Sequence, residues 1–412
     1  MSKSVIVACH AIHHEYMGGA FKLAGEFAEY LAQSGIRVHF VCGSSQEIAA
    51  NPVQRRGISI WRYPFPTVKG PGIRNLLAHL RGSAKQVRMI CKRERVVCLN
   101  GHSPLQFLGA ANGLGATRAN TRMVYSVHSP FAEEYRTAIA ANKTLKKKLA
   151  VGMAGILEKR IYRISHAIQC DSAYSAEFIS EAYRSQVGTK ATVVPGWVDL
   201  DRFGSSLDRD IARARLGGVW DSSIPIFLSV RRLERRMGLG NLVEACRSLR
   251  QQGFEFRLIL GGTGPLREEL QALCTQYGLA DHVSFLGRIP DEDLPDAYAA
   301  ADCFVLPTQA LECFGLIVLE AHASGTPVIA TPVGAIPEVM GRFRQDWLTD
   351  DASAESLTVK MRLFLENRLP FGRNELRTNA EAYRDTTVQE RLAQVVLGKR
   401  CESPSGVTAI SS

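Results

Sequence analysis

Short apolar runs alternate with amphipathic segments along the first half of the chain. Residues 4–9 and 36–42 are apolar runs of strand length, and residues 20–34 between them carry apolar side chains at helical spacing up to a stop at Gly35. Further strand-like runs follow, with helical patterns between them, at residues 96–99, 123–127 and 167–170. Strands that alternate with helices in this way predict a parallel, doubly wound α/β sheet.

The second half repeats this alternation. Strands are predicted at residues 225–230, 254–260, 283–286 and 303–306, and helices at residues 240–250 and 266–277. A chain of 412 residues is too long for one hydrophobic core, so two domains of about 200 residues each are expected. We predict an N-terminal domain (1–195), a C-terminal domain (196–379), a helix that returns to the first domain (about 380–398) and a disordered polar tail (399–412).

The stretch ECFGLIVLE, residues 312–320, follows the predicted strand at residues 303–306. An apolar helical segment opens at Gly315, after a short loop. A strand, a loop and a helix N-terminus form the arrangement that binds anionic groups at the carboxyl edge of a parallel sheet. Backbone N–H groups of Gly315, Leu316 and Ile317 are therefore predicted to face a diphosphate.

Two carboxylates flank this predicted anion site. Glu312, in the loop, can accept hydrogen bonds from the hydroxyls of a sugar, and Glu320, two turns into the helix, can accept them from a ribose diol. A sugar nucleotide contains a sugar, a diphosphate and a ribose in that order. The alternative interpretation is a loop glutamate beside a solvated helix glutamate, which is how isolated glutamates usually occur.

In this stretch the chain resembles the retaining glycosyltransferases of family four, the group 1 glycosyl transferases. Two glutamates separated by seven residues, with Phe314-Gly315 between them, form the signature of that family, and the likeness extends over residues 283–340 and more loosely over most of the chain. The resemblance implies the α/β GT-B fold, in which two doubly wound Rossmann-like domains face each other across a cleft. It also implies transfer of a sugar from a nucleotide-diphosphate sugar to an acceptor hydroxyl, with retention of the anomeric configuration.

The resemblance also assigns donor-binding positions in other loops. Gly18 and Gly19 precede the first predicted helix, where the family has a glycine pair that can meet a phosphate from the opposite side of the cleft. A plain loop is the commoner meaning of such a pair. Gly262 and Gly264, in GGTGPL, resemble a nucleotide-facing glycine turn, and Arg288 stands where relatives contact the base.

The motif SVRRLERRMG follows another predicted strand. In the family pattern Arg-Leu is followed by three residues and Lys-Gly, and the two cations grip the diphosphate; Arg232 and Gly238 match this pattern. Met237 stands at the lysine position and cannot donate, so Arg236 or Arg235 is expected to reach the phosphates instead. The predicted donor-binding residues are then Gly18, Gly19, Arg232, Arg236, Gly262, Gly264, Arg288, Phe314, Gly315, Leu316 and Glu320.

His128 ends the predicted strand at residues 123–127, where its side chain is expected to enter the cleft. The family carries a histidine at this strand end that contacts the transferred sugar, and the alternative is a histidine bound to the backbone. Asp171 and Ser172 follow the next strand end and, with Ser175, resemble a helix cap. The predicted catalytic residues are His128, Arg232 and Glu312.

No metal ion is expected, and no cofactor beyond the sugar nucleotide as a co-substrate. His10, His13 and His14 fit no metal-ligand spacing, and no cysteine pair accompanies them. The resemblance implies that helix N-termini and arginines meet the diphosphate charge. It further implies a same-face substitution in which a phosphate oxygen takes the acceptor proton, and closure of the cleft about hinges in the polar link at residues 196–223 and the returning helix.

Charge is unevenly distributed along the chain. Residues 1–190 carry 26 Lys and Arg against 11 Asp and Glu, a net +15, and residues 191–412 carry the −5 that leaves +10 for the whole chain. Residues 74–95 and 142–163 combine a basic face with apolar residues at helical spacing. These stretches could bind an anionic membrane surface, or they could be ordinary helices with a solvated basic face, and both interpretations stay open. Nucleic acid is not expected, because no interleaved aromatic residues accompany the charge.

A cytoplasmic location is expected, with peripheral attachment to the inner face of the membrane as an option. No apolar run approaches the ~18 residues of a membrane span, and the apolar N-terminal stretch is too short for a signal peptide. The ten cysteines lack Cys-x-x-Cys pairing, and several fall in strand-like runs, which is typical of buried, reduced thiols.

Two other functions remain open. A non-hydrolysing sugar-nucleotide epimerase shares the fold but needs carboxylates in the cleft of the first domain and lacks ECFGLIVLE. A non-catalytic partner subunit is supported only by Met237. For a glycosyltransferase, the acceptor could be a lipid carrier, a growing polysaccharide or a small natural product.

Overall fold

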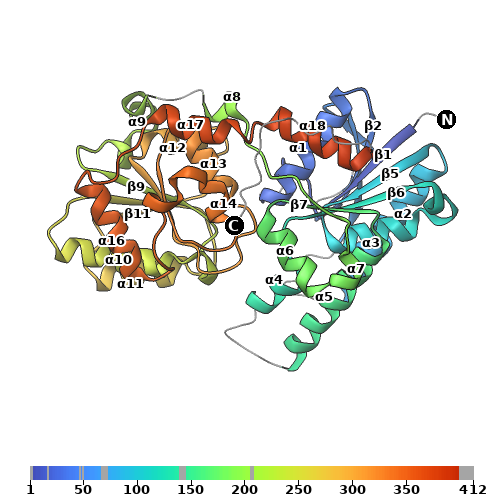
Figure 1. The fold of residues 1–412 in the computed structure, drawn as a ribbon, viewed down its shortest axis with the longest axis horizontal. Coiled ribbons are helices and arrows are strands. Elements are labelled where there is room, and N and C mark those ends of the chain that lie inside the picture. Colours follow the sequence, from blue (N-terminus) through green and yellow to red (C-terminus); the bar gives the residue numbers. More distant parts are fainter. Residues whose placement is uncertain are drawn as a thin grey trace.

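The computed structural model describes residues 3–15, 18–45, 48, 51–65, 73–138, 145–204 and 208–398, and the tail predicted at 399–412 lies outside these ranges. Two separate sheets organise the chain (Figure 1). The first sheet has the strand order β3-β4-β2-β1-β5-β6-β7-β8. Its strands are β1 (Lys3–Ala8), β2 (Arg37–Ser44), β3 (Val53–Arg55), β4 (Ile58–Pro64), β5 (Arg95–Gly101), β6 (Arg122–Val127), β7 (Ala167–Cys170) and β8 (Ala191–Val193).

The second sheet has the order β11-β10-β9-β12-β13, and every neighbouring pair in it is parallel. Parallel neighbours require crossover connections, which the helices between the strands supply. The two sheets confirm the prediction of two doubly wound α/β units. The strands of the second sheet are β9 (Ile226–Val230), β10 (Arg257–Gly261), β11 (Val283–Gly287), β12 (Cys303–Leu306) and β13 (Val328–Ala330).

Helices cover both faces of the first sheet, so the central strands β1 and β2 are buried on both sides. Side chains of β1 alternate between two cores: Ile6 and Ala8 join one, and Val5 and Val7 join the other. The helices that contribute to the first core are α2 (Ile73–Cys91), α3 (Pro104–Gly113), α5 (Leu145–Ile164), α6 (Ala173–Ala182) and α7 (Arg184–Val187). Helices α1 (Gly19–Gln33) and α18 (Asp385–Leu397) form the other, and α4 (Phe131–Ala138) and η1 (Gly115–Asn120) complete the domain.

The C-terminal helix α18 lies beside α1 on the first domain (Figure 1). Val388 and Leu392 of α18 are buried in the first-domain core. The chain therefore crosses between the domains twice, and the two crossings pair with each other. The N–H of Val198 donates to the carbonyl of Tyr383 at 3.0 Å, and the N–H of Asp385 donates to the carbonyl of Val198 at 3.2 Å.

The segment predicted as a polar link, residues 196–223, is largely packed on the second domain. Phe203, Ala212 and Trp220 are buried in that domain's core. The helices of this domain are α8 (Leu200–Phe203), α9 (Arg209–Leu216), η2 (Gly218–Trp220), η3 (Arg235–Met237), α10 (Leu239–Gln251), α11 (Arg267–Gln276), α12 (Leu294–Ala300), α13 (Leu316–Ala323), α14 (Ile336–Met340), η4 (Gly341–Phe343), α15 (Arg344–Trp347), α16 (Ala354–Leu365) and α17 (Arg373–Glu381).

Candidate functional site

Helix α13 begins where the two domains touch. Gly315 is its N-cap residue and has φ 95°, a left-handed conformation that glycine adopts without strain. Leu316, the first helical residue, packs against the cores of both domains. A Cβ atom added to Gly19 would lie 3.1 Å from the Leu316 side chain, and Gly18 is the N-cap residue of α1. The structure therefore brings the predicted glycine pair and the start of α13 together.

Phe314 packs against both segments of the chain that pass between the two domains. A Cβ atom added to Gly196 would come within 2.7 Å of the Phe314 ring, and the Tyr383 ring lies 5.8 Å away, centroid to centroid. The side chain is buried among these residues. Phe314 thus holds the α13 loop against both crossings.

Glu312 is held by a cation that the sequence analysis does not single out. Arg231, the first residue after β9, donates from Nη2 to Oε2 of Glu312 at 2.7 Å and also contacts Thr308. Only 5% of the Arg231 side chain is exposed. Burial lowers the pKa of the guanidinium, and the Glu312 carboxylate acts in the opposite direction. The pair is therefore a buried salt bridge at the carboxyl edge of the second sheet.

Among the arginines of the 231–236 segment, Arg236 also reaches the Glu312 loop. Its Nη1 atom donates to the carbonyl of Leu311 at 3.0 Å. Leu311 has φ 58°, which is uncommon for a residue other than glycine, and its carbonyl is fixed by this bond. Arg235 is exposed and donates instead to Glu269.

The Met237 side chain, which stands at the lysine position of the family pattern, is buried in the protein. Arg232 is exposed, and its Nη1 atom donates to Glu234 at 3.0 Å. Gly238, which the family pattern contains, has φ 74°, and a Cβ atom there would overlap the carbonyl of Pro307. The glycine therefore allows the arginine segment to pack directly on the Glu312 loop. Of the two arginines expected to replace the missing lysine, Arg236 is the one that contacts the Glu312 loop.

Glu320 lies on the other side of the α13 N-terminus and is buried. Lys22 of α1 donates from Nζ to its Oε1 atom at 2.9 Å, and the hydroxyl of Tyr298 donates to Oε2 at 3.0 Å. Burial by itself would lower the pKa of Lys22, but the carboxylates of Glu320 and Glu26 raise it above its ordinary value. Glu320 is therefore joined to the opposite domain through Lys22.

His128, just after β6, has both ring nitrogens bound to side chains. Nδ1 lies 2.8 Å from Oδ2 of Asp171, and Nε2 lies 2.8 Å from Nδ1 of His102. His102 in turn contacts Asn100 at 2.7 Å. His128 was predicted from the sequence, but neither His102 nor Asn100 was, although they lie at the end of β5, next to β6 in the same sheet. The alternative of a histidine bound to the backbone is wrong.

The start of α6 touches the Glu312 loop across the domains. Ser172 is the N-cap residue of α6, as predicted, and its Oγ atom donates to the carbonyl of Cys313 at 2.7 Å. The backbone N–H groups of Ala173 and Tyr174 donate to the carboxylate of Glu338 at 2.9 and 2.7 Å. Asp171, which contacts His128, therefore directly precedes the segment that touches the Glu312 loop.

The glycine turn after β10 serves backbone packing. A Cβ atom on Gly262 would overlap the carbonyl of Arg231, and one on Gly264 would overlap the backbone of Leu233. Because both residues are glycines, the turn packs directly against the backbone of Arg231 and Leu233. Arg288 is exposed at the end of β11.

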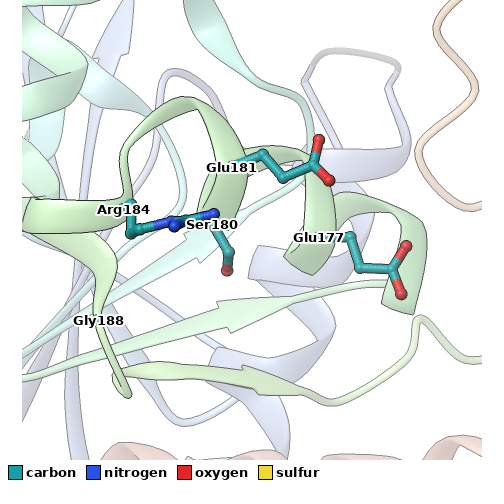
Figure 2. Close-up of a pocket in the computed structure, with 5 residues that line it drawn as sticks. All are labelled: Glu177, Ser180, Glu181, Arg184 and Gly188. Carbon is teal, nitrogen blue, oxygen red and sulfur yellow. The ribbon is translucent and has the colours of Figure 1, made fainter.

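The histidines considered as metal ligands make other contacts. The His10 ring stacks on Phe21 with centroids 5.9 Å apart, and Nε2 of His13 lies 3.9 Å from Glu29. Within the part of the chain that the structure describes, no three His, Cys, Asp or Glu side chains are grouped to hold a metal ion. A shallow hollow elsewhere, shown in Figure 2, contains none of the predicted site residues; it is lined by Glu177, Ser180, Glu181, Arg184 and Gly188.

The two basic stretches differ in their outer faces. On α2 the exposed residues Arg74, Arg81, Lys85 and Arg88 form an ordinary basic face. The exposed face of α5, described below, is partly apolar. Among the helices of the described ranges, none is at once long and apolar enough to cross a bilayer.

Two family models match the chain, one over each domain. The first half matches Glycosyltransferase Family 4 over residues 17–202, and the second matches Glycosyl transferases group 1 over residues 214–384. Among curated relatives, D-inositol 3-phosphate glycosyltransferase of Streptomyces avermitilis is 30% identical over 65% of this chain and 57% of its own length. A GDP-mannose-dependent alpha-(1-6)-phosphatidylinositol monomannoside mannosyltransferase of Mycolicibacterium smegmatis is 32% identical over 45% of this chain and 50% of its own. The chain thus spans about half the length of these relatives.

Solved structures share the whole architecture. Sucrose-phosphate synthase from Thermosynechococcus elongatus superposes with a TM-score of 0.79 at 20% identity, over 96% of this chain and 98% of the other. Anabaena HepE in complex with UDP and glucose gives 0.72 at 18% identity, over 95% and 98%. These likenesses confirm the predicted GT-B fold.

Proposed function

Because this chain belongs to the group 1 glycosyl transferases of family four, we propose that it transfers a sugar from a nucleoside-diphosphate sugar to an acceptor hydroxyl, with retention of the anomeric configuration. One observation carries the proposal: Glu312 and Glu320 flank the N-terminus of α13, and each has a cationic partner. N–H groups at a helix N-terminus and two flanking carboxylates match the diphosphate, sugar and ribose of such a donor.

In this proposal the donor diphosphate binds the N–H groups of Leu316 and Ile317, and Arg236 and Arg232 offset its charge. No metal ion is then needed. The ribose diol takes the place of Lys22 on Glu320. The donor can enter only after Lys22 has left this carboxylate, so the domains open along the contact and close again on the bound donor.

The transfer breaks the bond between the anomeric carbon and the diphosphate oxygen. A bond from the acceptor oxygen to the anomeric carbon forms on the same face of the sugar, and the acceptor proton passes to a phosphate oxygen of the leaving nucleoside diphosphate. The protein positions the reactants, stabilises the charge of the leaving group and excludes water. Arg231 fixes the Glu312 carboxylate that orients the sugar.

We place the acceptor at an anionic membrane surface, and helix α5 supports this part of the proposal. Leu149, Met153 and Ile156 are 65%, 49% and 69% exposed and recur on one face of α5. The exposed Arg160 and Arg163 continue that face. An apolar patch with adjoining cations suits the boundary of an anionic bilayer, and α5 projects from the first domain (Figure 1).

The inner face of α5 is firmly held, so the exposure of its outer face belongs to the folded helix. Buried Glu158 accepts hydrogen bonds from the hydroxyls of Tyr162 and Tyr183 and from the backbone of Phe131 and Ala132. These bonds fix α5 to α4 and to the segment that joins α6 and α7. Peripheral binding through α5 would present the cleft to a lipid-linked acceptor.

The test begins with UDP, GDP and ADP, of which one is expected to raise the melting temperature. The sugar nucleotides of that base are then incubated with lipid extract as the acceptor source. Glu312→Ala and Glu320→Ala, with the fold intact, should each lower transfer at least about a hundredfold, and EDTA should leave it unchanged. Undiminished transfer in both variants would refute the proposal.

The same assay separates the rival functions. An epimerase would convert the sugar nucleotide when no acceptor is present. A non-catalytic partner subunit would give no transfer. Failure of all three nucleoside diphosphates to bind would favour this function over a glycosyltransferase.

A further inference from the structure

The hydrogen bonds around His128 fix where its protons lie. The chain of contacts begins at Asn100, whose Nδ2 donates to the hydroxyl of Ser126 at 3.1 Å and to the carbonyl of Val124 at 3.4 Å. Because Nδ2 of Asn100 donates both of these hydrogen bonds, it is Oδ1 of Asn100 that faces His102, and this oxygen can only accept. Nε2 of His102, 2.7 Å away, therefore carries a proton and donates it.

His102 is neutral, so its other nitrogen has a free lone pair. The residue is buried, and this burial moves the pKa of His102 well below its ordinary value. A neutral imidazole with a proton on Nε2 has none on Nδ1. The 2.8 Å contact between Nδ1 of His102 and Nε2 of His128 is then a hydrogen bond that His128 donates.

The second nitrogen of His128 also donates. Nδ1 lies 2.8 Å from Oδ2 of Asp171. The other carboxylate oxygen, Oδ1, accepts from Nε2 of Gln169 at 2.9 Å, and the same Nε2 donates to the carbonyl of Val194 at 2.6 Å. Asp171 thus has a hydrogen-bond partner at each oxygen, and each nitrogen of His128 faces an acceptor.

We propose that His102 and Asp171 are positioning residues that hold His128 as an imidazolium cation at the carboxyl edge of the first sheet. The side chains of His128 and Asp171 are 12% and 5% exposed, so the cation and its counterion are both shielded from water. The charged group that the contacts place beside this pair is Glu338 of α14, which accepts from the N–H of Ala173, two residues after Asp171. A cation fixed here would complement the negative charge of a nucleoside-diphosphate donor.

This protonation state limits the chemistry of His128. An imidazolium has no lone pair and cannot accept the acceptor proton as a general base. The acceptor proton would then pass to a phosphate oxygen, as in the proposed transfer. This role of the cation rests on the proposed function, whereas the protonation state itself does not.

Nitrogen-15 NMR of the full chain, labelled at histidine, tests the inference directly. His128→Gln identifies the His128 signals. At neutral pH the parent protein should show protons on both ring nitrogens of His128 and only on Nε2 of His102. A neutral His128 in the parent protein overturns the proposal, whatever the activity. A doubly protonated His128 in a protein without glycosyl transfer would instead reject the proposed function alone.

Variants of the two partners supply the second readout. His102→Asn keeps an acceptor at the position of Nδ1 and should preserve the doubly protonated state, whereas His102→Leu should lose it. In Asp171→Asn, His128 should lose the proton on one ring nitrogen at neutral pH. The transfer rate of this variant should then fall between acid pH and about pH 8, whereas the parent rate stays level. Identical pH profiles for the two proteins would contradict the positioning role of Asp171.

Discussion

Lys22 and Glu320 form an ion pair that joins the two domains, with 2.9 Å between Nζ of the lysine and Oε1 of the glutamate. The pair lies between the first helix of one domain and the helix that begins the candidate donor site in the other. The side chains are only 18% and 11% exposed, and the hydroxyl of Tyr298 occupies the second oxygen of the carboxylate. A contact of this kind is worth little at a surface, but breaking it in a buried setting leaves a charge without its partner.

Lys22→Met should therefore destabilise the closed, ligand-free protein. Removing the ammonium leaves the buried Glu320 carboxylate without its cation, at a cost of about 3 kcal/mol in the free energy of unfolding. Thermal unfolding of the parent and the variant measures this loss. The double variant Lys22→Met/Glu320→Gln is the control, because a neutral amide needs no cation and should recover much of the stability. Equal melting temperatures for parent and Lys22→Met would show that the domains are not held by this pair.

Arg236→Ala should weaken nucleoside diphosphate binding, and Arg235→Ala should not. Both variants remove one guanidinium from neighbouring positions, but only Arg236 reaches the Glu312 loop, whereas Arg235 is exposed beside Glu269. Calorimetry with the nucleoside diphosphate that stabilises the parent should give about a tenfold higher Kd for Arg236→Ala, equivalent to about 1.4 kcal/mol. Equal affinities for the two variants would mean that Arg236 does not replace the absent lysine.

The fold could be predicted where apolar periodicity is strong. Strands β9 and β12 differ from their predicted bounds by one residue or less because each is a short apolar run inside a buried parallel sheet. The antiparallel pair β3–β4 was not predicted. β3 has three residues and lies at the sheet edge with exposed side chains, so its sequence carries little apolar signal. The amphipathic pattern of α18 predicts a helix but does not by itself say which domain the helix packs on.

The candidate site could be predicted where one local motif encodes it. Gly315, with its left-handed backbone, and the glutamates on either side lie within nine consecutive residues. The partners of these glutamates come from distant segments, so spacing along the chain did not reveal Lys22 or Arg231. Arg231 had a usable signal: it directly follows β9, at the carboxyl edge of a parallel sheet where ligand-binding side chains gather.

His322 should make the second domain sensitive to mild acid. It is buried on α13, and Nδ2 of Asn379 lies 3.0 Å from its Nδ1 atom, so that nitrogen accepts and the ring is neutral. Burial lowers the pKa of His322 to about 3. The unfolded chain then binds more protons than the folded one below the ordinary value of about 6.5, and stability falls as pH falls, by up to about 1.4 kcal/mol per pH unit.

Urea unfolding at several pH values between neutral and pH 5 measures this effect. His14 and His79, whose pKa values burial lowers to about 4, act in the same direction, so the parent protein sums several contributions. His322→Asn keeps an acceptor for Asn379 but does not titrate. Its stability should depend less steeply on pH than that of the parent, even if its absolute stability is lower. Parallel curves for the two proteins would show that His322 does not contribute.

Ile156→Glu should weaken binding to anionic vesicles without affecting the fold. The parent chain is expected to co-sediment with phosphatidylserine vesicles, and less so as salt rises, because exposed cations of α5 contribute to the binding. Loss of one apolar side chain from the bilayer boundary should reduce the partition about tenfold or more. Val359→Glu is the matched control, since Val359 is 42% exposed on α16 of the other domain.

The comparison of these two variants decides what covers α5. If both bind vesicles as the parent does, and salt has no effect, the membrane is not the partner of this helix. If Ile156→Glu instead converts a dimer to a monomer in sedimentation while Val359→Glu does not, the apolar patch is a contact between two copies of the chain. Selective loss of vesicle binding in Ile156→Glu, with the melting temperature unchanged, would tie the exposed patch of Leu149, Met153 and Ile156 to the membrane surface.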